Sequence, residues 1–179
     1  MIFHETELSS AFVIEPERFE DERGFFARNW SQTEFADRGL EGQFVESNSS
    51  LSLKKGTLRG MHFQAAPHAQ VKLVRCTQGA IYDVMIDLRA DSPTLRQWVA
   101  VELSAANRLM LYVPEGFAHG FQTLAPNTEV FYLVSAYYAP GSAGGVRWDD
   151  PAFRIRWPED DRTIIQRDRD YPDFDPAAS

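Results

Sequence analysis

The residues most able to do chemistry are concentrated in one short stretch of the sequence. Arg59, His62 and Lys72 lie within fourteen positions, in surroundings that are otherwise typical of strands. Gly56 and Gly60 allow the backbone to bend there and to re-aim the side chains. A lone histidine between apolar neighbours is most often a core residue. Three cationic or titratable groups on one strand pair are costly to bury without charge partners, so the stretch predicts a polar site.

Size and composition restrict the class of protein. The chain has 179 residues, 44% of them hydrophobic, which predicts a single domain over residues 1–179 with a sizeable core. The net charge of −8 argues against nucleic acid as a partner. The one cysteine, Cys76, excludes an internal disulfide and fits a reducing compartment. No apolar run approaches the ~18 residues of a membrane span, so we expect a cytoplasmic protein without a membrane partner.

Short alternating segments predict an all-β sandwich or barrel with very little helix. Ser31 and Glu34 have the spacing of a capping box, which predicts a short helix that runs to about Arg38 and stops at Gly39. From about Pro158 the chain is charged and is expected to be irregular. The expected strands cover residues 11–14, 25–30, 97–103, 109–113, 129–138, 146–148 and 155–157.

The strand after Gly79 has the clearest alternation. Tyr82, Val84, Ile86 and Leu88 define an apolar face, and the opposite face carries two carboxylates, at positions 83 and 87. The second face is therefore expected to meet either solvent or a polar pocket.

Two histidines lie in segments that resemble parts of the cupin signatures. His62 follows Gly56 by six positions, and His119 lies in the Gly-flanked run 114–121. The resemblance implies a cupin-type double-stranded jelly-roll barrel with one or two short helices. Gln64 stands where a metal cupin has its second histidine, so we expect no metal and no cofactor. A three-nitrogen site from His62, His68 and His119 stays open on sequence alone.

Together, several motifs resemble one family, the dTDP-4-dehydrorhamnose 3,5-epimerases. The match runs in order from about residue 10 to residue 172. The motifs lie at 21–26, 58–64, 72–75, 114–121, 148–151 and 166–168. The resemblance implies a metal-free epimerase, usually a homodimer, whose substrate is a nucleotide-linked sugar.

The resemblance also implies roles for individual residues. His62 falls on the base, Asp168 on the carboxylate that orients it, Tyr132 on the acid, and Lys72 on the lysine beside the sugar C4 oxygen. The expected substrate contacts are Arg23, Asn48, Arg59, His119, Tyr138 and Arg167, with Arg23 at the phosphates and Tyr138 stacked on the base. Without the resemblance, Tyr132 is typical of a packed strand aromatic, Lys72 of a solvent-facing lysine, and Asp168 of a solvated charge run.

The residue types suit this chemistry independently of the family. A proton next to a ketone is removed by a base with a pKa near 7, which histidine supplies. A carboxylate fixes the tautomer of that histidine, and a lysine stabilises the enolate oxygen. Inversion needs a second group that protonates the opposite face, for which a tyrosine is suitable.

The departures from the family pattern fall mostly on nucleotide recognition. Arg28 and Ala143 stand where the family commonly has Glu, and Glu46 begins a segment in which only Asn48 is retained. The reaction is therefore predicted more firmly than the nucleotide, the sugar, or the carbon that is inverted.

Three hypotheses follow. The first is an epimerase that inverts C3, C5 or both in a nucleotide-linked 4-keto-6-deoxyhexose. The alternatives are a metal-dependent cupin isomerase or dioxygenase and a non-catalytic sugar-binding jelly roll. A homodimer is expected, because the aromatic segment 25–30 is too apolar for a solvated edge.

Overall fold

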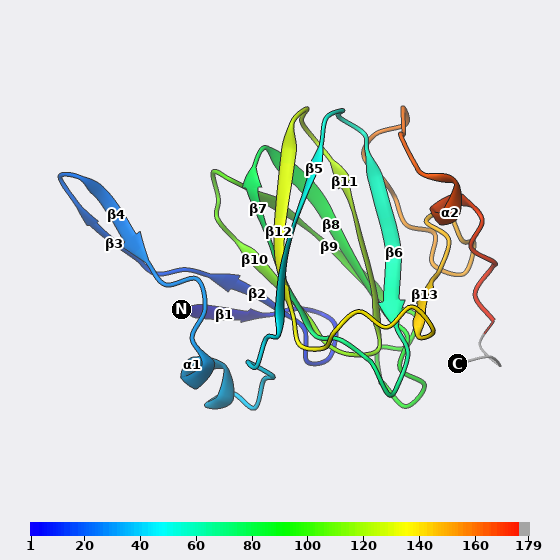
Figure 1. Ribbon diagram of the computed structural model, residues 1–179, viewed down its shortest axis with the longest axis horizontal. Helices are drawn as coiled ribbons and strands as arrows, with labels where there is room; N and C mark the ends of the chain where they lie inside the picture. The colour runs from blue at the N-terminus through cyan, green and yellow to red at the C-terminus, as the bar shows by residue number, and fades with distance from the viewer. Residues whose placement is uncertain (176–179) are drawn as a thin grey trace.

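Two antiparallel sheets face each other and form a cupin-type jelly roll, as predicted (Figure 1). The structure is a computed structural model and describes residues 1–175. The first sheet has the order β1 (Ile2–Glu5), β2 (Phe12–Glu15), β10 (Met110–Val113), β7 (Lys72–Gln78), β12 (Thr128–Val134) and β5 (Glu46–Ser52). The second has the order β13 (Ala143–Gly145), β6 (Leu58–Gln64), β11 (Phe117–Thr123), β8 (Ala80–Asp87) and β9 (Trp98–Ser104).

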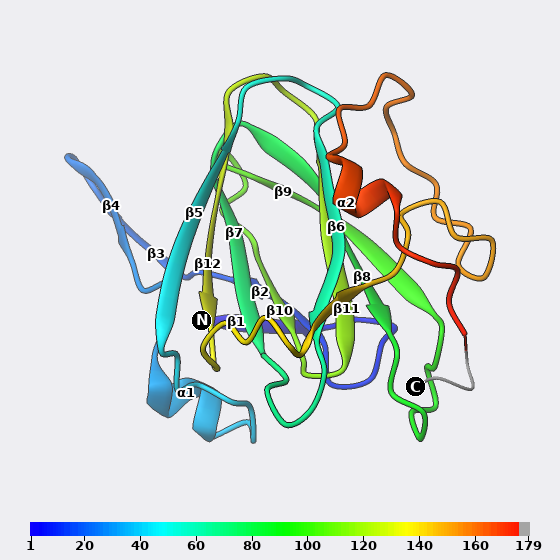
Figure 2. The same cartoon turned by 45° about the vertical axis from the view of Figure 1, so that its right-hand side comes forward.

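A separate hairpin and two short helices complete the described fold. The hairpin of β3 (Arg18–Asp21) and β4 (Gly24–Ala27) projects from the body of the molecule (Figure 1). Helix α1 (Gln32–Ala36) starts as predicted, with the Ser31 hydroxyl accepting from the Glu34 amide at 3.4 Å. Helix α2 (Gln166–Arg169) lies against β6, on the side away from the hairpin (Figure 2). Among the described residues, no helix is long and apolar enough to cross a membrane.

Strand β8 is buried on both faces, so its carboxylates meet a polar interior rather than solvent. Ile81 and Met85 pack in the core between the sheets, and Asp83 and Asp87 point to the same side with no exposure. The other face, with Val84 and Ile86, packs under the C-terminal segment. That segment contributes Val146, Phe153, Trp157 and Ile164 to this second cluster.

Some predicted boundaries are wrong. The strand expected over 25–30 ends at Ala27, and the strand expected over 129–138 ends at Val134. Residues 146–148 and 155–157 form no strand; they supply Val146 and Trp157 to the cluster under the second sheet. The chain after Pro158 is irregular only in part, because it contains α2 and a parallel bridge from Thr163 to Thr57.

A bulge in β6 determines which side chains face the interior. His119 pairs with His62, but Phe121, two positions later, pairs with Arg59, three positions from His62. The extra residue on β6 breaks the alternation, so Arg59 and His62 face the same side. Gly60, with φ +134°, lies in the bulge, and a Cβ there would come within 2.5 Å of the Gly120 Cα.

We predict that Gly60→Ala lowers the free energy of unfolding by more than ~2 kcal/mol, because the new methyl group meets backbone and the φ is unfavourable for alanine. Urea denaturation measures the effect. Gly141→Ala is the matched control, since no atom lies within 4 Å of its ideal Cβ and its φ is not positive. Equal stability of the two variants would contradict the packing described for the bulge.

Candidate active site

A cavity of about 560 Å³ lies between the two sheets and brings together all four residues predicted as catalytic. Its size suits a small-molecule site. The lining combines an apolar part, with Leu58, Phe121 and Val130, and a polar part. The predicted site residues in the lining are Arg59, His62, Lys72, His119, Tyr132, Arg167 and Asp168.

The partly buried His62 and the buried Asp168 form a pair across 106 positions of sequence. His62 Nε2 lies 2.8 Å from Asp168 Oδ1, and the Gly60 amide donates to Asp168 Oδ2 at 3.1 Å. Asp168 has no solvent exposure, so it is not part of a solvated charge run. Because Nε2–H is committed to Asp168, Nδ1 is the nitrogen that can accept a proton.

The electrostatics of this pair favour a neutral His62. Burial lowers the pKa of His62; the hydrogen bond and charge of Asp168 oppose that effect, and the charges of Lys72 and Arg167 add to it. Burial raises the pKa of Asp168, but the hydrogen bond and charge of His62, with the Gly60 amide and Arg167, outweigh it and leave that pKa low. The result is an unprotonated imidazole held by an ionised carboxylate at neutral pH.

Lys72 enters the same cavity from the opposite sheet. Its Nζ donates to the His62 carbonyl at 3.3 Å. Burial lowers the pKa of Lys72 to about 8, against the charge of Asp83, which raises it. The prediction of a solvent-facing lysine, made for Lys72 alone, is therefore wrong. At neutral pH Lys72 is a partly buried cation in this cavity, and a positive charge held there acts strongly on a developing anion.

Tyr132 and Asn48 are cross-strand neighbours on β12 and β5. Tyr132 is partly buried, lines the cavity and packs against the core. It is therefore both a packed strand aromatic and a residue of the site, the two interpretations given by the sequence. Burial raises its pKa, which keeps the phenol protonated at neutral pH. Asn48 is half-buried beside it but is not part of the cavity lining.

His119 lies on a strand, β11, rather than in a loop. Its Nε2 is 2.7 Å from Asp83 Oδ1, and both side chains are buried. The second face of β8 therefore serves a polar pocket. Arg59 lines the same cavity, with Nε donating to the Ser52 hydroxyl at 3.1 Å and Nη2 to the Leu51 carbonyl at 3.2 Å.

Other predicted contacts lie outside the cavity of a single chain. Arg23 is on the projecting hairpin with 84% of its side chain exposed, and Tyr138 is 62% exposed. Arg28 pairs with Glu34 at 3.2 Å. Neither Glu46 nor Ala143 belongs to the lining.

The histidine triad considered from the sequence is not assembled. His68 is exposed, whereas His62 and His119 each commit Nε2 to an aspartate. Gln64 is used structurally, since its Oε1 accepts from the Ala139 amide at 2.7 Å and its Nε2 donates to the His68 carbonyl. Within residues 1–175, no group of three or more histidine, cysteine or acidic side chains is placed to hold a metal.

Sequence reasoning missed three parts of the site. It noted Asp83 as a carboxylate on a strand face but did not connect it with His119. It did not find Tyr171, whose ring meets the His62 ring edge-on at a centroid distance of 6.1 Å. Thr163 and Ile165 also line the cavity from the C-terminal segment. No local pattern marks these contacts.

The fold and the site define the class of protein, a small cupin-type jelly roll with a His–Asp pair between its sheets. The family model for dTDP-4-dehydrorhamnose 3,5-epimerase matches residues 5–176. The chain is 47% identical over 159 residues to the dTDP-4-dehydrorhamnose 3,5-epimerase of Salmonella typhimurium, covering 88% of this chain and 86% of that protein. It therefore belongs to the dTDP-4-dehydrorhamnose 3,5-epimerase family.

Solved structures agree with this assignment. A dTDP-4-dehydrorhamnose 3,5-epimerase from Bacillus anthracis, with TDP and PPi bound, superposes with a TM-score of 0.93 at 44% identity, covering 97% of this chain and 99% of that one. A 3'-monoepimerase from Streptomyces bikiniensis in complex with dTDP-quinovose superposes with a TM-score of 0.88 at 30% identity, covering 95% and 86%.

We predict that Lys72→Met raises the free energy of unfolding at pH 7 by ~1–3 kcal/mol. The folded-state pKa of Lys72, about 8, lies below the 10.5 of an exposed lysine, so folding disfavours the ammonium. Below pH 8 that cost is present in full, and it disappears as the pH rises toward 10.5. The stability difference between variant and unchanged protein should therefore vanish over the same interval.

Urea denaturation at pH 7 and at pH 10 checks this prediction. Lys55→Met is the control, because Lys55 is a half-exposed lysine that pairs with Glu159 at the surface. Its effect should stay within about 0.5 kcal/mol. A Lys72→Met protein less stable than the unchanged one at pH 7 would show that the buried ammonium is not destabilising.

Proposed function

We propose that this protein is an isomerase that epimerises a nucleotide-linked 4-keto-6-deoxyhexose, as its family does. The observation that carries the proposal is one cavity in which the His62–Asp168 pair, Lys72 and Tyr132 converge. A base, a cation and an acid are the groups needed to remove a proton next to a ketone and to return one to the other face.

The steps are two proton transfers through an enolate. His62 Nδ1 takes the proton from the carbon next to the C4 ketone, and the electron pair moves to the C4 oxygen. The Lys72 ammonium stabilises that oxygen, and Asp168 stabilises the imidazolium. Tyr132 then protonates the carbon from the opposite face as the enolate returns to the ketone. Solvent removes the proton from His62 and restores the one lost by Tyr132.

The Streptomyces bikiniensis monoepimerase supports the roles of the histidine and the tyrosine. A structure of that enzyme carries substitutions of one histidine and one tyrosine that are as far apart in its sequence as His62 and Tyr132 are here. It also makes single-carbon inversion the second candidate. The higher identity to 3,5-epimerases favours inversion of both carbons.

A thymidine diphosphate sugar is the proposed substrate, because the related structures bind TDP or a dTDP-sugar. Arg59 and Arg167 supply positive charge at the cavity for a diphosphate. Glu46, Arg28 and Ala143 stay as proposed places where nucleotide recognition differs from that of the family.

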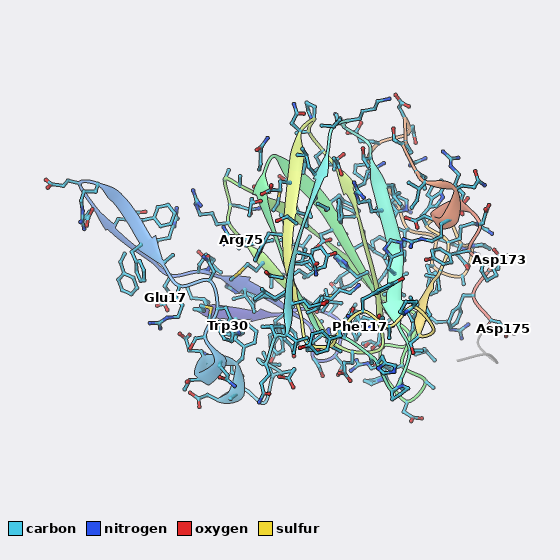
Figure 3. The ribbon with its side chains drawn as sticks, in the orientation of Figure 1. Glu17, Trp30, Arg75, Phe117, Asp173 and Asp175 are labelled. Carbon is cyan, nitrogen blue, oxygen red and sulfur yellow. The ribbon has the colours of Figure 1, made fainter. Side chains whose placement is uncertain are left out.

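We further propose that the protein acts as a homodimer in the cytoplasm. Phe19 and Phe26 pair across the projecting hairpin, and each is 67% exposed. Arg75 and Trp30 lie on the side of the barrel that faces this hairpin (Figure 3). A second copy would cover this apolar surface and would accept the hairpin, with Arg23, near its own cavity. Cell fractionation tests the location.

The proposed reaction predicts hydrogen exchange at the sugar. The unchanged protein should incorporate deuterium from solvent into a dTDP-4-keto-6-deoxyhexose, and His62→Asn should lower that rate by about 10²–10⁴-fold because the base is gone. Asp168→Asn should cost less, since it only supports the base. NMR measures exchange. His68→Asn, at an exposed histidine outside the cavity, is the control and should keep the full rate. Full-rate exchange by folded His62→Asn would end the assignment.

Tyr132→Phe should separate exchange from inversion in the same assay. His62 would still abstract and return protons on its own face, whereas net inversion would fall. The ring is kept, so stability should change by only about 1 kcal/mol. Tyr137→Phe, at an exposed tyrosine, should leave both rates unchanged. If Tyr132→Phe inverts and exchanges at the normal rates, another group is the acid.

If the hairpin forms the dimer contact, substitutions in it should change the sedimenting mass of the protein. The unchanged protein should sediment as a dimer at micromolar concentration, and Phe19→Ser combined with Phe26→Ser should shift it toward monomer, because the apolar contact is lost. Tyr137→Ser removes an equally exposed aromatic away from the hairpin and should leave the dimer intact. A monomeric unchanged protein would refute the proposal.

A further inference from the structure

Asp83 is a buried carboxylate for which the two proton transfers have no role. Its side chain on β8 has no solvent exposure, and its Oδ1 accepts from His119 Nε2 at 2.7 Å. Within residues 1–175, Oδ2 is buried and has no hydrogen-bond partner. An unpaired carboxylate oxygen in the interior is costly, and a nearby positive charge lessens that cost.

Lys72 supplies that charge from the opposite sheet. In the part of the chain that the structure describes, Lys72 has no carboxylate within ion-pair distance, and its Nζ donates to the His62 carbonyl. The negative charge of Asp83 still reaches it, since it opposes the effect of burial on the pKa of Lys72. His62, His119 and Asp83 lie on neighbouring strands of one sheet, and Lys72 lines the cavity with His62 and His119 from the opposite sheet.

The other groups around Lys72 do not replace this carboxylate. Asp168 is already paired with His62, and Tyr132 is neutral at the pH of interest. The charged or titratable side chains that line the cavity together with Lys72 are Lys54, Arg59, His62, His119, Tyr132, Arg167 and Asp168. The same elements also carry Glu46, Arg75, Cys76, Glu129 and Arg169, which lie outside the lining.

We propose that Asp83 is a positioning residue, which holds His119 with Nε2 protonated and keeps Lys72 in its ammonium form inside the barrel. The inference rests on the proposed function, in which that ammonium stabilises the enolate oxygen. His119 presents Nδ1 to the substrate as an acceptor for a hydroxyl group, because Nε2–H is committed to Asp83. Through His119, Asp83 thus sets which hydrogen bond the site offers to a sugar hydroxyl. Through Lys72, it maintains the positive charge beside the ketone.

The first test needs no substrate. Asp83→Asn keeps the shape of the side chain and removes its charge. In ligand-free protein with ¹³C-labelled lysine, the pKa of Lys72 should fall about one pH unit below its value in the unchanged protein. Long-range ¹⁵N–¹H spectra should show His119 leaving the Nε2–H tautomer, since the new amide can donate to Nε2. An unchanged lysine titration would overturn the inference.

The second test uses activity. The alkaline limb of kcat/KM should lie near pH 8 in the unchanged protein, where Lys72 loses its proton. In Asp83→Asn that limb should move about one pH unit lower, so that the ratio of activity at pH 8 to activity at pH 6.5 falls by a further factor of about four. The acid limb, set by His62, should stay in place. A uniform loss at every pH would mean that Asp83 only supports the fold.

Asp87→Asn is the matched control. Asp87 is on the same strand and the same face, is equally buried, and lies about 13 Å further along β8. It is bound by Arg89, Ser92 and Thr94 rather than by the site. Its loss should lower stability without moving the lysine titration or the alkaline limb. A shift equal to that of Asp83→Asn would overturn the inference.

The outcomes also separate this inference from the proposed function. A fall in the lysine pKa in Asp83→Asn, in a protein that exchanges no sugar proton, would support the electrostatic role and refute the epimerase assignment. Normal exchange of the sugar proton with an unchanged Lys72 pKa in Asp83→Asn would support the epimerase assignment and refute the electrostatic role of Asp83. If Asp83→Asn does not fold, the same two NMR measurements on the unchanged protein test the inference. A Lys72 that titrates above pH 10, or a His119 in the Nδ1–H tautomer, would overturn it.

Discussion

The pair of His62 and Asp168 is the contact on which the rest of the site depends. It joins the middle of β6 to the C-terminal segment, and it buries a carboxylate completely. Hydrogen bonds to its oxygens stabilise such a group inside a protein, and the Gly60 amide and His62 provide them. The Gly60 bulge therefore serves two purposes, since it turns His62 toward the cavity and offers an amide to the carboxylate that orients it.

The C-terminal segment must be held firmly for this pair to exist. Gln122 and the backbone of Glu159 exchange two hydrogen bonds, of 2.9 and 3.0 Å. Thr163 bridges to Thr57, and the apolar side chains of the segment cover the outer face of the second sheet. The C-terminal segment is thus part of the site, because it buries one face of β8 and places Asp168 beside His62 of β6. Without it, the barrel would keep its histidine and lose the group that orients it.

The interior also concentrates positive charge in a protein that is negative overall. Burial lowers the pKa of both His62 and Lys72, which leaves His62 neutral near pH 7, whereas Lys72, with a pKa of about 8, stays charged. These are the protonation states that enolate chemistry requires. The arrangement costs stability, because a buried ammonium is unfavourable, and such costs are common where function sets the residue type. The negative charge of Asp83 opposes the effect of burial on the pKa of Lys72.

The sequence by itself determined the β architecture, the capped helix at Ser31, and the residue types available for proton transfer. These properties are local: alternation, capping and turn residues act over a few positions. Tertiary structure alone decided that Asp168 is buried, that Asp83 serves His119 rather than solvent, and that residues 146–157 pack as a cover instead of forming strands. A charged run has the same pattern whether or not it folds onto a sheet. The environment of Asp168 is set by contacts with a strand about a hundred positions away. Neither the bulge at Gly60 nor the packing of the C-terminal segment produces a periodic pattern in the sequence.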